Sequence, residues 1–215
     1  MKERNMKNFV DHLHEKKDPE SDTFHAFDID DTLFHHDNNK LRIHVLDPNN
    51  KRIQTLSTKE YANHKKLPDH TYDFREFQSA ERFGESAKPI RKMIAKLKAI
   101  HRNNKNVELL TARSDLDDKH KFAHHMNKYG IDTSEIHVRR AGNHEEIPGH
   151  VAKAMIMHDL INNNGYKKVH LYDDSESNLK EFLLLKKKHP EVEFHAHHVQ
   201  HDPETDKVIL TTRKV

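Results

Sequence analysis

The sequence predicts an α/β fold built on a mostly parallel central sheet, and two observations lead to that prediction. Short apolar runs such as "FHAFDI", "VELLTA", "VHLY" and "VEFHAHHV" are typical of buried strands. Polar stretches with helical spacing separate these runs, and strands that alternate with helices favour right-handed crossovers in a parallel sheet. At 215 residues, the chain is expected to form a single domain spanning 1–215.

Composition narrows the class of protein. Hydrophobic and charged residues each make up 33% of the chain, but the apolar residues are clustered, which indicates a folded protein with a small core. There is no cysteine for a disulfide or thiolate site, and a net charge of +2 is too small to argue for nucleic acid by itself. No P-loop or GxGxxG pattern occurs. Without a signal-like or membrane-length apolar run, we expect a soluble cytoplasmic protein that needs no membrane and no obligate protein partner.

In the first part of the chain, a short strand stands between two polar segments. Residues 1–20 predict an amphipathic helix, and residues 23–29 predict the first strand. Residues 41–56 alternate apolar and polar positions on both sides of "DPNN", which predicts a hairpin. Together with the polar stretch after it, this hairpin defines a small insertion at 37–88, made of a hairpin and helical segments.

The rest of the chain alternates helices and strands. Pro89 stands near a helix start, while Gly130 and Gly165 fit the ends of two later helices. The predicted helices cover 88–104, 115–130, 150–165 and 177–189, and the predicted strands cover 107–112, 135–140, 167–174 and 192–199. The tail at 207–215 predicts an edge strand or a hairpin.

Histidine is unusually frequent, at 22 residues, and "HAHHVQH" at 195–201 is the densest cluster. Strand alternation puts His195 and His197 on one face and His198 on the other. The cluster is either a zinc site or a strand that bears solvated or half-buried histidines, the second being the commoner arrangement.

Acidic or hydroxyl side chains follow three of the predicted strands. The first strand ends in Asp28 and Asp30, the second in Thr111, and the strand "VHLY" in Asp173 and Asp174. One acidic strand end can be only a turn or a helix cap. In a parallel sheet, however, all three ends meet at one edge, where such folds bind ligands.

Carboxylates brought together at that edge repel one another unless a cation compensates. Mg²⁺ is the expected cofactor because it takes oxygen ligands and bridges to phosphate. Beside such an ion, an aspartate can attack an anionic phosphoryl group and form an aspartyl-phosphate. The pattern therefore predicts phosphoryl chemistry.

The motifs resemble those of the haloacid dehalogenase-like (HAD) phosphohydrolase superfamily. "FDIDDTLF" resembles its first motif, DxDxT, and "VELLTAR" resembles the second. Lys153 lies in the region of the third motif, and "VHLYDDSESNL" resembles the fourth. Order and approximate spacing hold from 22 to 199. The resemblance implies a HAD-like Rossmannoid three-layer sandwich with the insertion at 37–88 as a small cap.

The resemblance also implies roles for the acidic residues. Asp28 would attack phosphorus, and Asp30 would act as general acid and then as general base. The Asp28 carboxylate, the Asp30 main-chain carbonyl and an acid from the fourth motif would hold Mg²⁺. Asp174 is favoured as the direct ligand, with Asp173 in support.

Other implied site residues carry alternatives. Thr111 would bind a phosphoryl oxygen or is simply a β-branched strand residue. Lys153 would offset the charge of Asp28 and phosphate, or it is a surface lysine replaced by Arg139, Arg140 or Lys167. Arg113 binds substrate or pairs with Asp115 on the surface.

Two further positions near these motifs have possible roles. Asn178 would orient the waters of the metal. His35 and His36 line the entrance or, as the commoner case, are solvated loop residues.

A small cap leaves the site open to an exposed phosphate. "TARSD" and "LYDD" are also similar to the phosphatase part of phage polynucleotide kinase-phosphatases and to small phage-type HAD proteins. The expected function is a Mg²⁺-dependent phosphomonoesterase whose partner is a phosphorylated small molecule or a nucleic-acid 3′-phosphate end. The alternatives are a catalytically silent HAD-like binding module and a phosphotransferase with an acceptor other than water.

Overall fold

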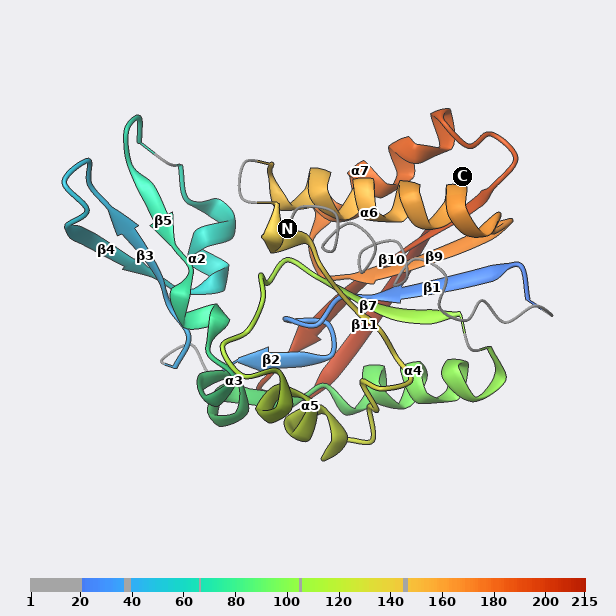
Figure 1. Ribbon diagram of the computed structural model, residues 1–215, viewed down its shortest axis with the longest axis horizontal. Helices are drawn as coiled ribbons and strands as arrows, with labels where there is room; N and C mark the ends of the chain where they lie inside the picture. The colour runs from blue at the N-terminus through green and yellow to red at the C-terminus, as the bar shows by residue number, and fades with distance from the viewer. Residues whose placement is uncertain (1–20, 37–39, 66, 105, 145–146) are drawn as a thin grey trace, which may run out of the picture.

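The computed structural model describes residues 21–36, 40–65, 67–104, 106–144 and 147–215 (Figure 1). The helix predicted at 1–20 lies outside these residues. Among the described helices, none has both the length and the apolar character that crossing a membrane requires.

A six-stranded sheet forms the centre of the molecule, in the order β11-β10-β9-β1-β7-β8. Its strands are β1 (Thr23–Phe27), β7 (Val107–Thr111), β8 (Val138–Arg140), β9 (Lys168–Asp173), β10 (Glu193–Asp202) and β11 (Lys207–Lys214). Neighbours from β10 to β8 pair in parallel, and only the edge strand β11 is antiparallel. The predicted α/β class with a mostly parallel sheet is therefore confirmed.

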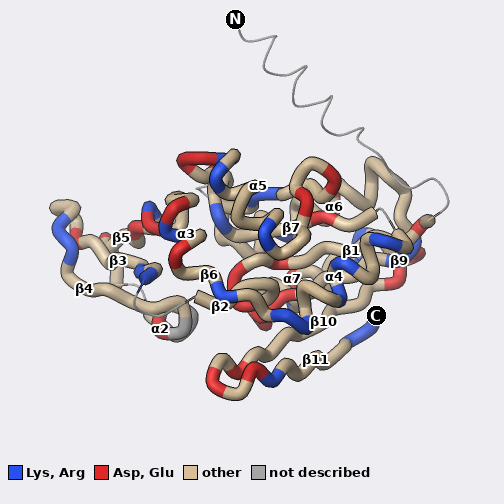
Figure 2. Tube along the Cα trace, turned by 90° about the horizontal axis from the view of Figure 1, so that it is seen from below, with Lys and Arg blue, Asp and Glu red and all other residues tan. Residues whose placement is uncertain are grey.

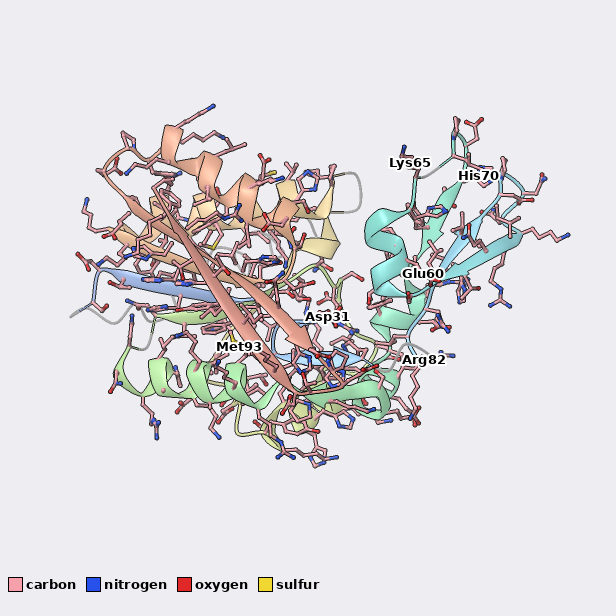
Figure 3. All side chains as sticks on the ribbon, turned by 180° about the vertical axis from the view of Figure 1, so that it is seen from behind. Asp31, Glu60, Lys65, His70, Arg82 and Met93 are labelled. Carbon is pink, nitrogen blue, oxygen red and sulfur yellow. The ribbon has the colours of Figure 1, made fainter. Side chains whose placement is uncertain are left out.

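Helices cover both faces of this sheet (Figure 1). They are α3 (Ala80–Ser86), α4 (Arg91–Asn103), α5 (Lys119–Asn127), α6 (Gly149–Asn164) and α7 (Glu176–Leu184), with short 3-10 turns η2 (Arg75–Gln78), η3 (Ala141–Asn143) and η4 (Leu185–Lys187). Residues that alternate along each strand divide into two cores. Phe27 and Leu109 pack with α3, α4 and α5, whereas Phe24 and Ala26 pack with α6 and α7. Met93, labelled in Figure 3, is a residue of α4 that packs in the same core as Phe27 and Leu109.

The register brings the ends of the central strands level. On β1, Phe27 pairs with Leu109 of β7 on one side and with Tyr172 of β9 on the other. The Asp28 N–H continues this pairing, since it donates to the Tyr172 carbonyl at 2.9 Å. The residues that follow Phe27, Leu109 and Tyr172 therefore reach the same edge of the sheet.

The 37–88 segment forms smaller elements beside that edge (Figure 1). They are a sheet of β3 (Ile43–Leu46), β4 (Arg52–Leu56) and β5 (Thr71–Asp73), and helix α2 (Thr58–Asn63). At the boundaries of the segment, β2 (Phe34–His36) pairs with β6 (Ala87–Pro89). The antiparallel β3–β4 pair confirms the predicted hairpin. Ser57 and Glu60 form a reciprocal capping box that starts α2. Figure 3 labels Asp31, in the loop after β1, and Glu60, on α2.

Observed boundaries differ from the predicted ones where caps act. The helix predicted from 115 begins at Lys119, because the Asp118 side chain accepts from the Lys121 N–H and caps it. The strand predicted at 135–140 is shorter in the structure, where it spans only Val138–Arg140. The tail confirms the edge-strand prediction, pairing along its whole length with β10.

Candidate active site

Three carboxylates meet at the carboxyl edge of the sheet. Asp28 directly follows β1, Asp173 ends β9, and Asp174 is the next residue. One oxygen of each lies within 4.8 Å of the others, so the predicted convergence of these strand ends is confirmed. Asp28 and Asp173 are buried, at 4% and 0% exposure, while Asp174 is half-buried.

Lys153 supplies the opposing charge from the first turns of α6. Its Nζ lies 2.6 Å from Asp28 Oδ1 and 2.8 Å from Asp173 Oδ2. The side chain is only 2% exposed, so the alternative of a surface lysine is wrong. Arg139 and Arg140, the possible substitutes, pair instead with Glu108 and Asp115.

Asp173 and Asp174 have different surroundings. The Asp173 carboxylate accepts from Lys153, from Asn178 Nδ2 at 2.9 and 3.0 Å, and from the Ser175 N–H at 2.9 Å. Within the described part of the chain, no hydrogen bond reaches the Asp174 carboxylate. Asp173 therefore belongs to a saturated network with Lys153, whereas Asp174 has free oxygens. Asn178 reaches the cluster from α7 by contacting Asp173, and a role in orienting the waters of a metal stays a prediction.

The pKa values of the site residues reflect the crowding of the three carboxylates. Burial, together with the neighbouring Asp173 and Asp30 charges, raises the pKa of Asp28 to about 8 despite the contact with Lys153. Burial and the same cluster of acids also raise the pKa of Asp174 well above its ordinary value. Burial opposes the Lys153 charge, but Asp173 and Asp28 outweigh it and raise the pKa of that lysine. One ammonium for three carboxylates leaves a site that attracts further positive charge.

Asp30 faces a second group of residues. Arg113 holds its carboxylate through Nε, at 3.1 and 2.8 Å, and through Nη2, at 2.6 Å, and His36 Nε2 lies 2.6 Å from Oδ1. Burial opposes its charge, but Arg113 and His36 outweigh burial and lower the pKa of Asp30 below its usual range. Arg113 is 3% exposed, so the alternative of a surface pair with Asp115 is wrong.

The contact of His36 with Asp30 is one that sequence reasoning did not predict. His36 is 9% exposed, and its Nδ1 lies 2.8 Å from Ser86 Oγ, so the expectation of a solvated loop is wrong for it. The β2–β6 pairing positions it, because His36 lies opposite Ala87. Nothing local in the sequence indicates that pairing, because the two short strands are far apart along the chain and no single turn connects them. His35 is half-buried and packs its ring 4.9 Å from His201.

Thr111 ends β7, the strand next to β1 in the sheet. It is fully buried, and its Oγ1 accepts from the Arg113 N–H at 3.1 Å, which leaves the hydroxyl proton free to donate. The loop after Thr111 is packed on η3: a Cβ at Gly142 would lie 2.4 Å from the Ala112 carbonyl oxygen. That close approach holds Arg113 in place.

Comparisons with known proteins give no match: no protein family, no curated protein and no solved structure matches the chain. The HAD resemblance therefore stays a prediction carried by the motifs. What the site does has to be argued from its own contacts.

Proposed function

We propose that this chain is a Mg²⁺-dependent phosphomonoesterase of the HAD type that works through a phosphorylated aspartate, Asp28. One observation carries the proposal: Asp28 and Asp174, from the ends of β1 and β9, share a cluster with oxygens within 4.8 Å, and Lys153 touches Asp28 at 2.6 Å. Clustered acids that served only the fold would be a costly arrangement, because each buried charge costs several kcal/mol unless it is compensated.

The donor set fits Mg²⁺. All the available ligands are carboxylate or carbonyl oxygens, and the Asp174 carboxylate accepts no hydrogen bond from the described residues. Asp28, Asp174 and the main-chain carbonyl of Asp30 would hold the ion, while Lys153 keeps Asp173 occupied. When bound, the ion would neutralise phosphate charge and let an anionic carboxylate approach phosphorus.

The covalent step begins at Asp28. Its free carboxylate oxygen attacks phosphorus, the phosphorus–oxygen bond to the leaving alcohol breaks, and that oxygen takes up a proton. Water then attacks the same phosphorus and loses a proton, the bond to Asp28 breaks, and inorganic phosphate leaves. Lys153 and the Thr111 hydroxyl stabilise charge on the phosphoryl oxygens.

Asp30 suits the second step of this reaction, in which water attacks phosphorus. Arg113 and His36 keep its carboxylate ionised, which is the state that accepts a proton from the attacking water. To protonate the leaving oxygen, Asp30 must first gain a proton and loosen its contact with Arg113. We infer that Arg113 positions Asp30, and that a role in binding substrate requires Arg113 to exchange this partner for phosphate.

The substrate class we propose is a phosphomonoester on a nucleotide or at a nucleic-acid 3′ end. Support comes from two aromatic residues of the insertion: the ring centroids of Tyr61, on α2, and Phe74, just after β5, lie 5.4 Å apart, and Phe74 is 40% exposed. Exposed aromatic side chains are stacking surfaces for bases. Basic and acidic residues are interspersed along the trace (Figure 2), so substrate choice would depend on such local contacts rather than on net charge.

The test measures hydrolysis of p-nitrophenyl phosphate, mononucleotides, sugar phosphates and 3′- or 5′-phosphorylated oligonucleotides, with Mg²⁺ and with a chelator. Asp28→Asn should abolish turnover, and Asp174→Asn should raise the Mg²⁺ concentration needed. Asp159→Asn, on an exposed position of α6, is the matched control and should keep wild-type rates.

No Mg²⁺-dependent turnover across the panel would contradict the proposal and favour a binding module. Turnover stimulated by added alcohols would favour phosphotransfer to an acceptor other than water.

A further inference from the structure

Four imidazoles form a row on the opposite face of the same strands. The histidine row consists of His25 on β1, His170 on β9, and His195 and His197 on β10. His25 pairs with His170 in register, and His170 pairs with His195. All four alternate away from Phe24 and Ala26, so they lie on the α4 face rather than on the α6 face that carries Lys153.

The rings of this row are in close contact. Ring centroids lie 4.3 Å apart for His25 and His170, 4.4 Å for His170 and His195, and 5.2 Å for His170 and His197. His195 and His197 are buried, at 6% and 8% exposure. Repulsion between neighbouring charges disfavours more than one imidazolium in such a group, and each neutral ring has one nitrogen lone pair.

Partners on the outer side of the row select which nitrogens face inward. His195 Nε2 lies 2.5 Å from Glu193 Oε1, and His197 Nδ1 lies 2.8 Å from Thr212 Oγ1. A ring N–H donated to an oxygen in this way leaves the other nitrogen as a lone pair, as is usual for histidines that bind metals. The inward nitrogens are then His195 Nδ1 and His197 Nε2.

The third nitrogen is already close to these two. His170 Nδ1 lies 2.9 Å from His197 Nε2, a hydrogen bond in which the N–H of one ring donates to the other ring. One ring nitrogen from each of His170, His195 and His197 can be chosen so that all three lie within 4.8 Å of one another. Nearby, His25 Nδ1 is buried and makes no hydrogen bond to the described residues.

We propose that His170, His195 and His197 form a binding site for a divalent transition-metal ion of the zinc class. Three imidazole nitrogens are a ligand set that Zn²⁺ accepts, with bonds of about 2.0–2.1 Å, and a water can complete the tetrahedron. Binding replaces the His170–His197 hydrogen bond, and His170 moves its proton from Nδ1 to Nε2, so no net proton transfer to solvent is needed.

The ion would join β9 to β10 beside the antiparallel edge strand. The ion would lie on the opposite face of the sheet from the acidic cluster and would share no ligand with that cluster, because Tyr172 and Asp173 point to opposite faces of β9. His198, the next residue after His197 on β10, faces the other way, and its Nε2 donates to the Asp174 main-chain carbonyl at 2.9 Å. This site is independent of the proposed phosphatase activity.

The experiment uses the full chain, dialysed against chelator and titrated with Co²⁺ as a spectroscopic probe and then with Zn²⁺ in competition. We expect one tight equivalent whose visible absorption is typical of tetrahedral Co²⁺. His195→Asn and His197→Gln should each weaken binding at least tenfold while the far-ultraviolet circular dichroism stays that of the wild type.

Two controls separate this site from other metal ligands. His158→Asn disrupts a different histidine pair, whose Nδ1 lies 2.7 Å from His189 Nε2, and should leave the tight equivalent intact. Asp174→Asn, in the acidic cluster, should do the same. Binding that is lost in either control and kept in the His195 and His197 variants would overturn the proposal.

X-ray absorption on the wild-type protein loaded with one equivalent of Zn²⁺ provides a test that needs no variant. Multiple scattering from about three imidazoles is expected. A shell of oxygen ligands alone, or the absence of any tight equivalent, would show that the row is only a stack of neutral rings.

Discussion

The two faces of β9 carry groups of opposite chemistry. On the α6 face, Asp173 brings a carboxylate to Asp28, and the Lys153 ammonium lies within hydrogen-bond distance of both. On the α4 face, His170 lies among other imidazoles, and burial, then the charges of neighbouring histidines, lower its pKa. A period of two along a single strand is enough to separate hard oxygen donors from nitrogen donors.

The two groups also differ in what holds them together. The acidic cluster depends on one ammonium, so removal of Lys153 leaves buried charges without a partner. The histidine row depends on ring stacking and on oxygens at its outer side, so loss of one ring removes only part of the packing. Variants that remove one member from each group should therefore have unequal effects.

Lys153→Met should have the largest effect. With the ammonium removed, the buried Asp28 and Asp173 are unpaired, and we expect the free energy of unfolding to fall by about 3–5 kcal/mol. Urea denaturation followed by circular dichroism measures the change, and Mg²⁺ should restore part of the loss. Lys180→Met, at an exposed position of α7, is the control. A loss of less than about 1 kcal/mol would contradict a charge-balancing role for Lys153.

Arg113→Lys should have a smaller effect on stability and a clear one on catalysis. Lysine keeps the charge but cannot reproduce the two-nitrogen contact with Asp30, and we expect kcat/KM for p-nitrophenyl phosphate to fall about tenfold or more. Arg75→Lys changes a similar contact with Asp73 that involves neither Asp30 nor the acidic cluster, at a side chain that is 80% exposed, and it should keep the wild-type rate. Equal rates for all three proteins would show that Asp30 does not need this contact.

The sequence allowed the acidic cluster and its lysine, Lys153, to be predicted, but not the contacts of Asp30. Strand patterning located the ends of β1, β7 and β9, and parallel pairing then required Asp28, Thr111 and Asp174 to meet. The contact of Asp30 with His36 could not be read in this way, because it depends on the long-range β2–β6 pair. Such three-residue strands have no recognisable period.

The histidine row shows the same limit. Alternation predicted correctly that His195 and His197 share a face and that His198 faces away. Their contact with His170 and His25 depends on strand order and register, which bring together positions from three strands. Neither strand order nor register can be read from sequence spacing alone.

His25→Phe tests the neutral character of the row and should give the smallest effect. Burial, then the charges of Lys96 and His195, lower the pKa of His25 from 6.5 to about 4. Between these values the unfolded chain binds a proton at this residue that the folded chain does not, so stability falls as pH decreases from 6.5. Without that residue, the dependence of unfolding free energy on pH should weaken by up to about 1.4 kcal/mol per pH unit.

Urea unfolding between pH 6.5 and 4 in the presence of chelator measures that slope for the wild type and the variant. His25→Gln is the matched control for shape: it removes the same titrating group without an aromatic ring, and it should weaken the slope equally although its stability at neutral pH is lower. An unchanged slope in both variants would mean that His25 is protonated in the folded chain, and the row would then be a charged group like the acidic cluster behind it.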